Sequence, residues 1–310
     1  MSEIFTLTVT DEFEGLRLDQ WMALELSEMH SRSQIQKWID SKCVQTVQGD
    51  VKSSRKVEAD EQYTVFIPEI EPFHVDPVDL KIKVLFEDKD LAVIVKPPGI
   101  AVHPGPGQNK VTLINGLYYL WKDLKPTEEN IRPGIVHRLD APTEGVMVIA
   151  KNTHIHHKLA DQFKDRTTEK EYSAWLLSSP PETEGRIELP IRRHRSNRLK
   201  MAVDPKGREA ITEYRAEKYV TSNKGRKFCL VDLKIFTGRT HQIRVHMSQM
   251  GCPIVGDELY SRSAKEFGKF GLLLLARRLA FTHPATGERM QFETEMPQRF
   301  LDFERKCAFY

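Results

Sequence analysis

The chain has 310 residues, 40% of them hydrophobic and 29% charged, and its mean hydropathy is −0.46. These values exclude a membrane-spanning, collagenous or wholly disordered chain and allow one large domain or two smaller ones. No apolar run approaches the roughly 20 residues of a membrane helix, and the N-terminal residues lack the basic start and apolar core of a signal peptide. We therefore expect a cytoplasmic protein without membrane contact.

The formal charge of +2 hides an asymmetry along the chain. Residues 1–75 hold seven Lys and Arg against fourteen Asp and Glu, whereas the rest hold 39 against 30. The densest basic segment, residues 186–208, contains Arg186, Arg192, Arg193, Arg195, Arg198, Lys200, Lys206 and Arg208. Such a segment attracts polyanions through counterion release. A solvated surface loop would have the same composition.

Residues 13–67 are predicted to form two short helices followed by strands. Two sets of apolar residues have helical spacing, namely Leu18, Trp21 and Met22, then Ile35, Trp38 and Ile39. Ser33 and Gln36 make a capping-box pattern at the start of the second helix. Residues 68–80 contain three prolines and little periodicity, so we expect a linker there.

Residues 81–310 are dominated by segments rich in Val, Ile, Tyr and Phe, which favour strands. The residues Asn223–Gly225 are expected to form a hairpin turn between two of these strands. Two helices are predicted, one from near Thr153 and one from near Thr240 that ends at Gly251. The expected fold is α+β, a domain with a mixed, mainly antiparallel sheet preceded by a small α+β domain.

The segment PGIVHRLDAPTEG places Asp140 on a short loop, with Arg138 two residues away. A nucleophilic carboxylate must stay ionised while partly desolvated, and a nearby arginine favours the charged form. Asp140 and Pro142 also have the spacing of an ordinary turn. The spacing leaves both interpretations open.

The segment TGRTHQIRVHMSQMG supplies a second group of polar residues. In a helix starting at Thr240, His241 and Arg244 would share one face, and Arg244 could reach Asp140 across a cleft. Alternatively, Arg239 and Arg244 are surface charges that flank the helix.

In these motifs the chain resembles the RNA pseudouridine synthases of the RluA group. The resemblance extends over nearly the whole chain and includes KPPGIAVHPGPG, TLINGL, GIVHRLDAPTEG, KEYSAWL, TGRTHQIRVHMSQMGCPIVGDELY and RLAFTHPATGE. The N-terminal RLDQWMALELSEMHSRSQIQKWI is similar to the small alpha-L RNA-binding module of many members. The resemblance implies an enzyme that isomerises specific uridines in structured RNA, ribosomal or transfer RNA, to pseudouridine.

The resemblance also implies roles for individual residues. Asp140 matches the aspartate that attacks the target uridine, so that the base detaches, turns and is reattached through carbon 5. Tyr172 matches a tyrosine that packs on the base and is a candidate for the later proton abstraction. Arg244 matches the arginine that pairs with the catalytic carboxylate, and Arg138 one that helps fill the place of the flipped nucleotide. Further substrate contacts are expected from His137, Arg239 and His241.

RNA contacts outside the cleft are expected from Arg17, Arg32 and Lys37 of the N-terminal module and from Arg192, Arg193 and Arg195. Phosphate contacts depend on local rather than total charge, so the acidic module can still bind RNA. It could instead bind protein or act as a folding cap for the catalytic domain. We expect a monomer.

No cofactor is expected. The cysteines Cys43, Cys229, Cys252 and Cys307 lie far apart without a C-x-x-C pair, which argues against a disulfide framework and a thiolate zinc site. His154, His157 and Asp161 have a helical spacing that could bind a metal, but no further ligand accompanies them.

One residue departs from the family pattern. The family usually has Ser where this chain has Glu144, four residues after Asp140. A second carboxylate facing the cleft would oppose ionisation of the first, so we expect Glu144 to point away or to pair with an arginine. The rival functions are a non-catalytic RNA-binding or ribosome-assembly protein that retains the synthase fold, and a hydrolase, which would need paired carboxylates.

Overall fold

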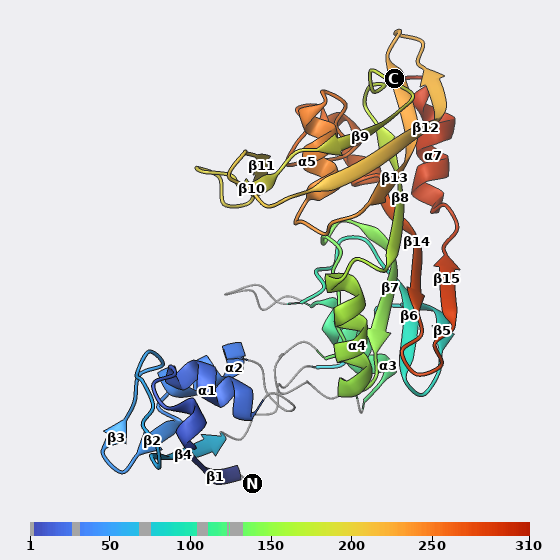
Figure 1. The fold of residues 1–310 in the computed structure, drawn as a ribbon. Coiled ribbons are helices and arrows are strands. Elements are labelled where there is room, and N and C mark those ends of the chain that lie inside the picture. Colours follow the sequence, from blue (N-terminus) through green and yellow to red (C-terminus); the bar gives the residue numbers. More distant parts are fainter. Residues whose placement is uncertain (1–2, 27–31, 68–75, 104–110, 123, 125–132) are drawn as a thin grey trace. The chain divides into compact units, whose positions relative to one another are not determined.

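The computed structural model describes residues 3–26, 32–67, 76–103, 111–122, 124 and 133–310. The described residues before 68 form one compact unit and those from 76 onward form a second (Figure 1). The helices among them are all too short or too polar to span a membrane. Most of the predicted linker, residues 68–75, lies outside the described residues.

The first unit is a four-stranded antiparallel sheet, in the order β1-β4-β2-β3, packed against two helices. Its elements are β1 (Glu3–Thr8), α1 (Leu18–Glu25), α2 (Arg32–Asp40), β2 (Val44–Thr46), β3 (Gly49–Asp50) and β4 (Gln62–Ile67). Both predicted helices are present, and their apolar residues form the core around Trp21 and Tyr63, whose rings lie 5.3 Å apart.

The structure differs from the sequence prediction at two places in this unit. Strand β1 pairs with β4 along its whole length, so the unit begins before residue 13. The sequence pattern of residues 3–8 is too short to predict a strand by itself. The strand is defined by its pairing with β4. Helix α2 begins at Arg32, before the predicted cap Ser33.

The second unit is built on a mixed sheet, which among the described residues has the order β5-β6-β7-β14-β8-β13-β12-β9, with β15 also paired to β14. Its strands are β5 (Lys83–Glu87), β6 (Leu91–Lys96), β7 (Glu144–Ala150), β8 (Glu169–Leu176), β9 (Glu184–Glu188), β12 (Ile211–Thr221), β13 (Lys227–Ile235), β14 (Leu274–Thr282) and β15 (Arg289–Glu293). Only the β7–β14 pair of this sheet is parallel in the described part of the chain. The α+β prediction with a mainly antiparallel sheet is confirmed.

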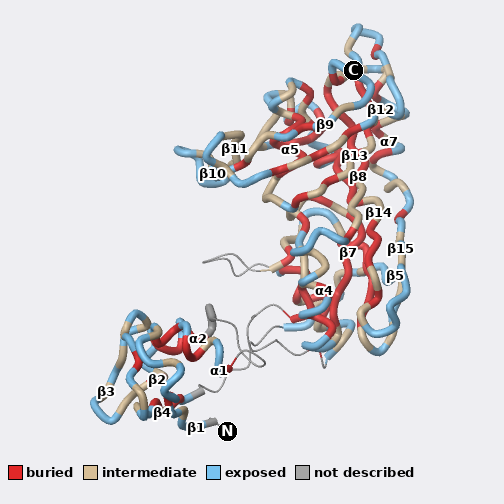
Figure 2. The backbone as a smooth tube through the Cα atoms, viewed as in Figure 1, coloured by how far each residue is buried: buried red, intermediate tan, exposed pale blue. Residues whose placement is uncertain are grey.

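The remaining elements surround this sheet. They are α3 (Leu113–Leu120), α4 (Thr153–Lys164), α5 (Gln242–Gln249), α6 (Ala264–Phe267), α7 (Gln298–Cys307) and a two-stranded ribbon of β10 (Ile191–Arg193) and β11 (Met201–Val203). Buried residues follow β7, β8 and β14 through the middle of the unit (Figure 2). Nearly every residue of β6 and β7 is buried, so these strands are covered on both faces. Their almost continuously apolar sequences fit this position. Cys229, Cys252 and Cys307 are free and buried, and Cys43 is free and half-buried.

Helix α4 begins at Thr153 as predicted, because the Asn152 side chain accepts the amide hydrogen of Ile155 at 2.9 Å. The helix predicted from near Thr240 is present as α5 and begins two residues later, at Gln242, because His241 before it has a left-handed backbone with φ 57°. The Gln242 side chain accepts hydrogen bonds from Thr237 and Arg239 and so holds the loop before the helix. The apolar periodicity of the sequence does not reveal these bonds. His241 and Arg244 therefore do not share a helix face.

Candidate active site

Asp140 lies on the loop that precedes β7, at the edge of a cleft of about 460 Å³. The Thr143 amide donates to the Asp140 carbonyl at 3.0 Å, so the residue does begin a turn. Its side chain is only 15% exposed and accepts a hydrogen bond from Arg244 Nη1 at 3.2 Å. The turn interpretation is therefore confirmed, and the same turn presents the Asp140 carboxylate to the cleft.

Arg244 is a buried residue of α5 rather than a surface charge, with 4% of its side chain exposed. Its Nε and Nη2 atoms each donate to one carboxylate oxygen of Asp257 at 2.8 Å. The burial of Arg244 opposes its charge, but Asp257 and Asp140 outweigh this effect and raise the pKa of the guanidinium. This bidentate contact with Asp257 fixes the plane of the Arg244 guanidinium. The third nitrogen, Nη1, therefore faces Asp140.

Sequence reasoning did not single out Asp257, although it lies within the quoted motif. Its side chain is fully buried, and its Oδ1 also accepts the amide hydrogens of Leu259 and Tyr260. A buried arginine requires an acidic partner. Once Arg244 is known to be buried, the nearby GDELY segment is where such an acid would be sought.

His241 and Tyr260 lie on another side of Asp140. The Nε2 atom of His241 is 3.9 Å from Asp140 Oδ2, and its Nδ1 is 2.8 Å from the Tyr260 hydroxyl. The guanidinium of Arg244 lies 5.2 Å from the centre of the Tyr260 ring, a cation–π contact. Tyr260 is a second residue that sequence reasoning missed.

Tyr172 and Lys170 come from β8, where residues two apart share a face. Tyr172 is 9% exposed, and burial, followed by the charge of Asp140, raises its pKa, so the phenol is neutral at neutral pH. Burial lowers the pKa of Lys170, whose Nζ lies 5.9 Å from the Phe163 ring.

His137, Arg138 and Arg239 also line the cleft. The His137 ring accepts the Val148 amide hydrogen at 3.1 Å and stacks on Phe163, and burial lowers its pKa to about 3. It is therefore a neutral part of the cleft wall. Arg138 is exposed, and Arg239 donates through Nε to the Glu209 carbonyl at 2.9 Å.

Lys96, at the end of β6, is completely buried beside the Asp140 loop. Its Nζ donates to the carbonyls of Pro97 and Ile100 at 2.8 Å each and of Ala141 at 3.1 Å. Burial lowers its pKa to about 8. The ammonium thereby anchors the peptide that follows Asp140, a role not apparent from the sequence.

We expect Lys96→Met to lower the free energy of unfolding by about 2–3 kcal/mol, because three buried carbonyls lose their donor. Urea unfolding measures this. Lys83→Met is the control, since Lys83 is exposed, and should stay within about 0.5 kcal/mol of the parent protein. Equal stability of the two variants would show that the Lys96 contacts contribute little.

Glu144, the residue that departs from the family pattern, pairs with an arginine as expected. Its Oε2 accepts from Arg299 Nε at 3.0 Å, and both side chains are 18% exposed. Arg299 also donates to the carbonyl of Leu272. The charge of Glu144 is thus compensated by Arg299 of α7, and Glu144 is not an unpaired carboxylate.

Glu144→Gln should lower the free energy of unfolding by about 1–2 kcal/mol, because it leaves the largely buried Arg299 charge without its carboxylate. The rate of a single turnover should change less than about twofold, since Glu144 pairs with Arg299 rather than with Asp140 or Arg244. Glu295→Gln, at an exposed position, controls for the loss of one negative charge. A tenfold change in rate would place Glu144 in the chemistry.

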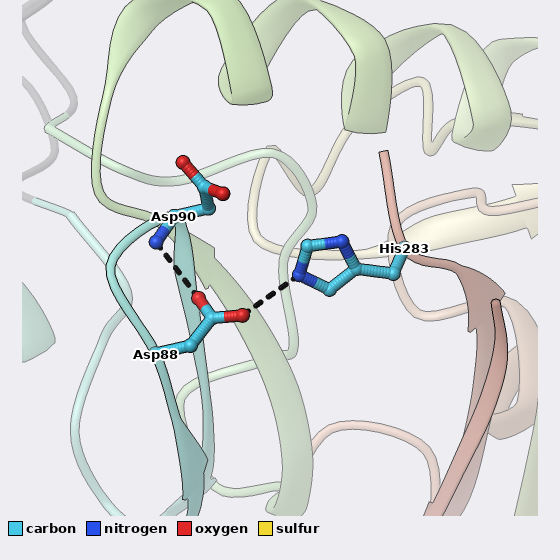
Figure 3. Close-up of side chains that lie close together, drawn as sticks. All are labelled: Asp88, Asp90 and His283. Atoms are coloured by element: carbon cyan, nitrogen blue, oxygen red, sulfur yellow. Dashed lines mark hydrogen bonds and ion pairs between the residues drawn. The ribbon is translucent and has the colours of Figure 1, made fainter. Parts of the chain in front are cut away.

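Asp88, Asp90 and His283 lie close enough to suggest a metal site, with ligand atoms within 4.8 Å of one another (Figure 3). However, Asp88 Oδ1 accepts the Asp90 amide hydrogen at 2.7 Å, and Oδ2 lies 2.8 Å from His283 Nε2. The other His283 nitrogen accepts the amide hydrogens of Ala285 and Thr286 at 3.2 Å each. Both ring nitrogens are therefore engaged, and the group ties the β5–β6 turn to the end of β14.

The basic segment forms the ribbon β10–β11, which extends away from the main sheet (Figure 1). Arg192, Arg193 and Arg195 on it are exposed. Asp204 Oδ2 is 3.6 Å from Arg192 and 3.4 Å from Arg195, so one carboxylate offsets part of their charge.

The structure describes the side chains of two of the three predicted RNA-contact residues in the N-terminal unit, Arg17 and Lys37. Arg17 is exposed and donates to Asp19 at 2.9 Å, and Lys37 is exposed on α2. The side chain of Arg32 lies outside the described residues.

Comparison with known proteins identifies the family of this chain. Residues 90–249, which include Asp140, Tyr172 and Arg244, match the family model for RNA pseudouridylate synthase. The chain is 41% identical to a protein of Aquifex aeolicus named an uncharacterized RNA pseudouridine synthase, over 97% of this chain and 96% of that one. The chain belongs to the RNA pseudouridine synthase family. It is therefore an isomerase that acts on uridine in RNA.

Other relatives agree with this assignment. The synthase is 37% identical to the ribosomal large subunit pseudouridine synthase D of Zymomonas mobilis, over 94% of each chain. Among solved structures, human RNA pseudouridylate synthase domain containing 4 matches with a TM-score of 0.56 and 29% identity, over 72% of this chain and 92% of that one. The human domain containing 1 protein matches with a TM-score of 0.58 and 25% identity, over 71% and 86%.

Proposed function

We propose that Asp140 is the nucleophile of the isomerisation. The observation that supports this most directly is the contact between Asp140 and Arg244, whose guanidinium is clamped by the buried Asp257. The clamp keeps a positive charge and a hydrogen-bond donor beside a carboxylate that is only 15% exposed. The uracil base is retained and reused, so a second catalytic carboxylate is not required.

We assign the other cleft residues to holding the flipped uridine. A uridine stacked in RNA must be extruded before its sugar can be attacked. Tyr172 offers an aromatic surface for the base, and its raised pKa keeps it as a neutral phenol. Arg138, exposed at the edge of the cleft, is placed to occupy the space that the nucleotide leaves.

The hydrogen released at carbon 5 provides the test of this chemistry. Reattachment of uracil through carbon 5 expels that hydrogen, so RNA labelled with tritium at carbon 5 of uridine should release tritium. A hydrolase would instead release free uracil, which chromatography detects.

The pairing of Glu144 with Arg299 removes the one feature that favoured a non-catalytic protein.

We propose large-subunit ribosomal RNA as the substrate. The support is the name of relatives such as the ribosomal large subunit pseudouridine synthase D of Zymomonas mobilis, at 37% identity over 94% of each chain. Mapping pseudouridines in cells with and without the gene tests the proposal. Loss of a site in transfer RNA alone would contradict it. The monomeric state and the cytoplasmic location stay predictions.

We further propose that the N-terminal unit, predicted at residues 13–67 and extended by β1 in the structure, adds RNA affinity, and that residues 81–310 carry the chemistry. A protein starting at Asp76 should retain its single-turnover rate within about twofold at saturating RNA and bind about 100-fold more weakly, since a second attachment site raises effective concentration. Its affinity should still fall steeply with salt, because Arg192, Arg193 and Arg195 remain. Unchanged affinity with a reduced saturated rate would instead make the unit part of the catalytic site.

A further inference from the structure

A chain of contacts leads from the basic ribbon to Asp140. The Met201 amide in β11 donates to the Tyr260 hydroxyl oxygen at 2.7 Å. That hydroxyl lies 2.8 Å from His241 Nδ1, and His241 Nε2 lies 3.9 Å from Asp140 Oδ2. Since the Met201 amide can only donate, the Tyr260 hydroxyl accepts that bond, and its own hydrogen is available to His241.

We propose that Tyr260 and His241 act as positioning residues: Tyr260 donates to Nδ1 of His241, which places the hydrogen of the neutral imidazole on Nε2, facing Asp140. The proposal rests on the proposed role of Asp140 as nucleophile. Arg244 approaches the same carboxylate oxygen from α5 at 3.2 Å. Asp140 then has the Arg244 hydrogen bond on one side and, on Nε2 3.9 Å away, the partial positive charge of its hydrogen, which disfavours rotation of the carboxylate before the uridine arrives.

The surroundings of His241 support a neutral ring. Its side chain is 15% exposed, and burial is the largest cause that lowers its pKa. The groups facing it are the acids Asp140 and Asp257, which favour its charge, the cations Arg138 and Arg244, which oppose it, and the phenol of Tyr260. A neutral imidazole carries one hydrogen, so its tautomer decides whether Asp140 meets a donor or a lone pair.

The left-handed backbone at His241 provides a discriminating pair of variants. His241 has φ 57°, a conformation that Asn tolerates better than Gln. A Gln amide nitrogen reaches about as far as Nε2, whereas an Asn amide reaches only about as far as Nδ1. The proposal therefore predicts that His241→Gln retains the single-turnover rate within about fivefold and that His241→Asn loses about 50-fold. Backbone fit alone predicts the opposite order.

Tyr260→Phe removes the hydroxyl and keeps the ring against Arg244. Without the Tyr260 donor, the hydrogen of the neutral ring can lie on Nδ1, so that Asp140 faces a lone pair on Nε2; protonation of the ring at lower pH restores a hydrogen on both nitrogens. We expect a rate about tenfold lower than that of wild type at pH 8 and a difference of only about twofold at pH 6, with RNA affinity changed less than twofold. An equal deficit at both pH values would contradict the tautomer as the cause.

Histidine-selective ¹⁵N NMR of the full chain reads the tautomer directly, with the His241→Gln spectrum identifying the resonance. Nε2–H in wild type and a changed pattern in Tyr260→Phe support the proposal. Nδ1–H in wild type, or an unchanged tautomer and pH profile in Tyr260→Phe, overturns it. Asp140→Asn is measured alongside: if it turns over, the proposed nucleophile is wrong, whereas an inactive Asp140→Asn with an unaffected Tyr260→Phe refutes the positioning pair alone.

Discussion

Asp140→Asn should abolish isomerisation, with a loss of about 10⁴-fold or more in single-turnover rate, while the fold and RNA binding stay nearly unchanged. The amide has the size of the carboxylate and can still accept a hydrogen bond from Arg244, but it is not an anionic nucleophile. Tritium release from RNA labelled at carbon 5 of uridine measures the rate, and urea unfolding and filter binding measure stability and affinity.

The control for this experiment is Asp161→Asn, on the exposed face of α4. It removes the same charge without touching the cleft and should keep the parent rate within about twofold. Appreciable turnover by a homogeneous Asp140→Asn preparation would refute the assignment of the nucleophile.

Arg244→Ala should have the second largest effect, because Arg244 serves two carboxylates at once. We expect a rate loss of about 10²–10³-fold, since Asp140 loses the hydrogen bond and the neighbouring positive charge that hold it in the cleft. We also expect a loss of about 3–5 kcal/mol in the free energy of unfolding, because Asp257 is left as a buried charge without its partner.

Two further variants separate these effects. Arg244→Lys keeps the positive charge but cannot bind both oxygens of Asp257 in one plane, so it should fold better than Arg244→Ala and remain a poor catalyst. In the double variant Arg244→Ala with Asp257→Ala, the stability loss should be smaller than the sum of the single losses. A defect in RNA binding without one in catalysis would instead assign Arg244 to phosphate contacts.

Local patterns in the sequence were sufficient for most of the fold. Apolar residues and turn signals predict the helix at Thr153 and the strands β5, β6, β7, β8, β12 and β13, because each signal lies within a few consecutive positions; they do not predict β9, β14 and β15. Strand β1 and the left-handed residue before α5 were not predicted. Both depend on a partner elsewhere, β4 in one case and the Gln242 side-chain contacts in the other.

The sequence by itself determined the family, the candidate nucleophile and the arginine expected beside it, because these residues lie within long, contiguous motifs. Only the tertiary structure decided what holds them in place. Asp257, Tyr260 and Lys96 act through contacts that cross between elements, and the Glu144–Arg299 pair joins residues 155 positions apart. The role of a buried charge depends on the partner that compensates it. Tertiary packing, rather than proximity along the chain, determines which residue that partner is.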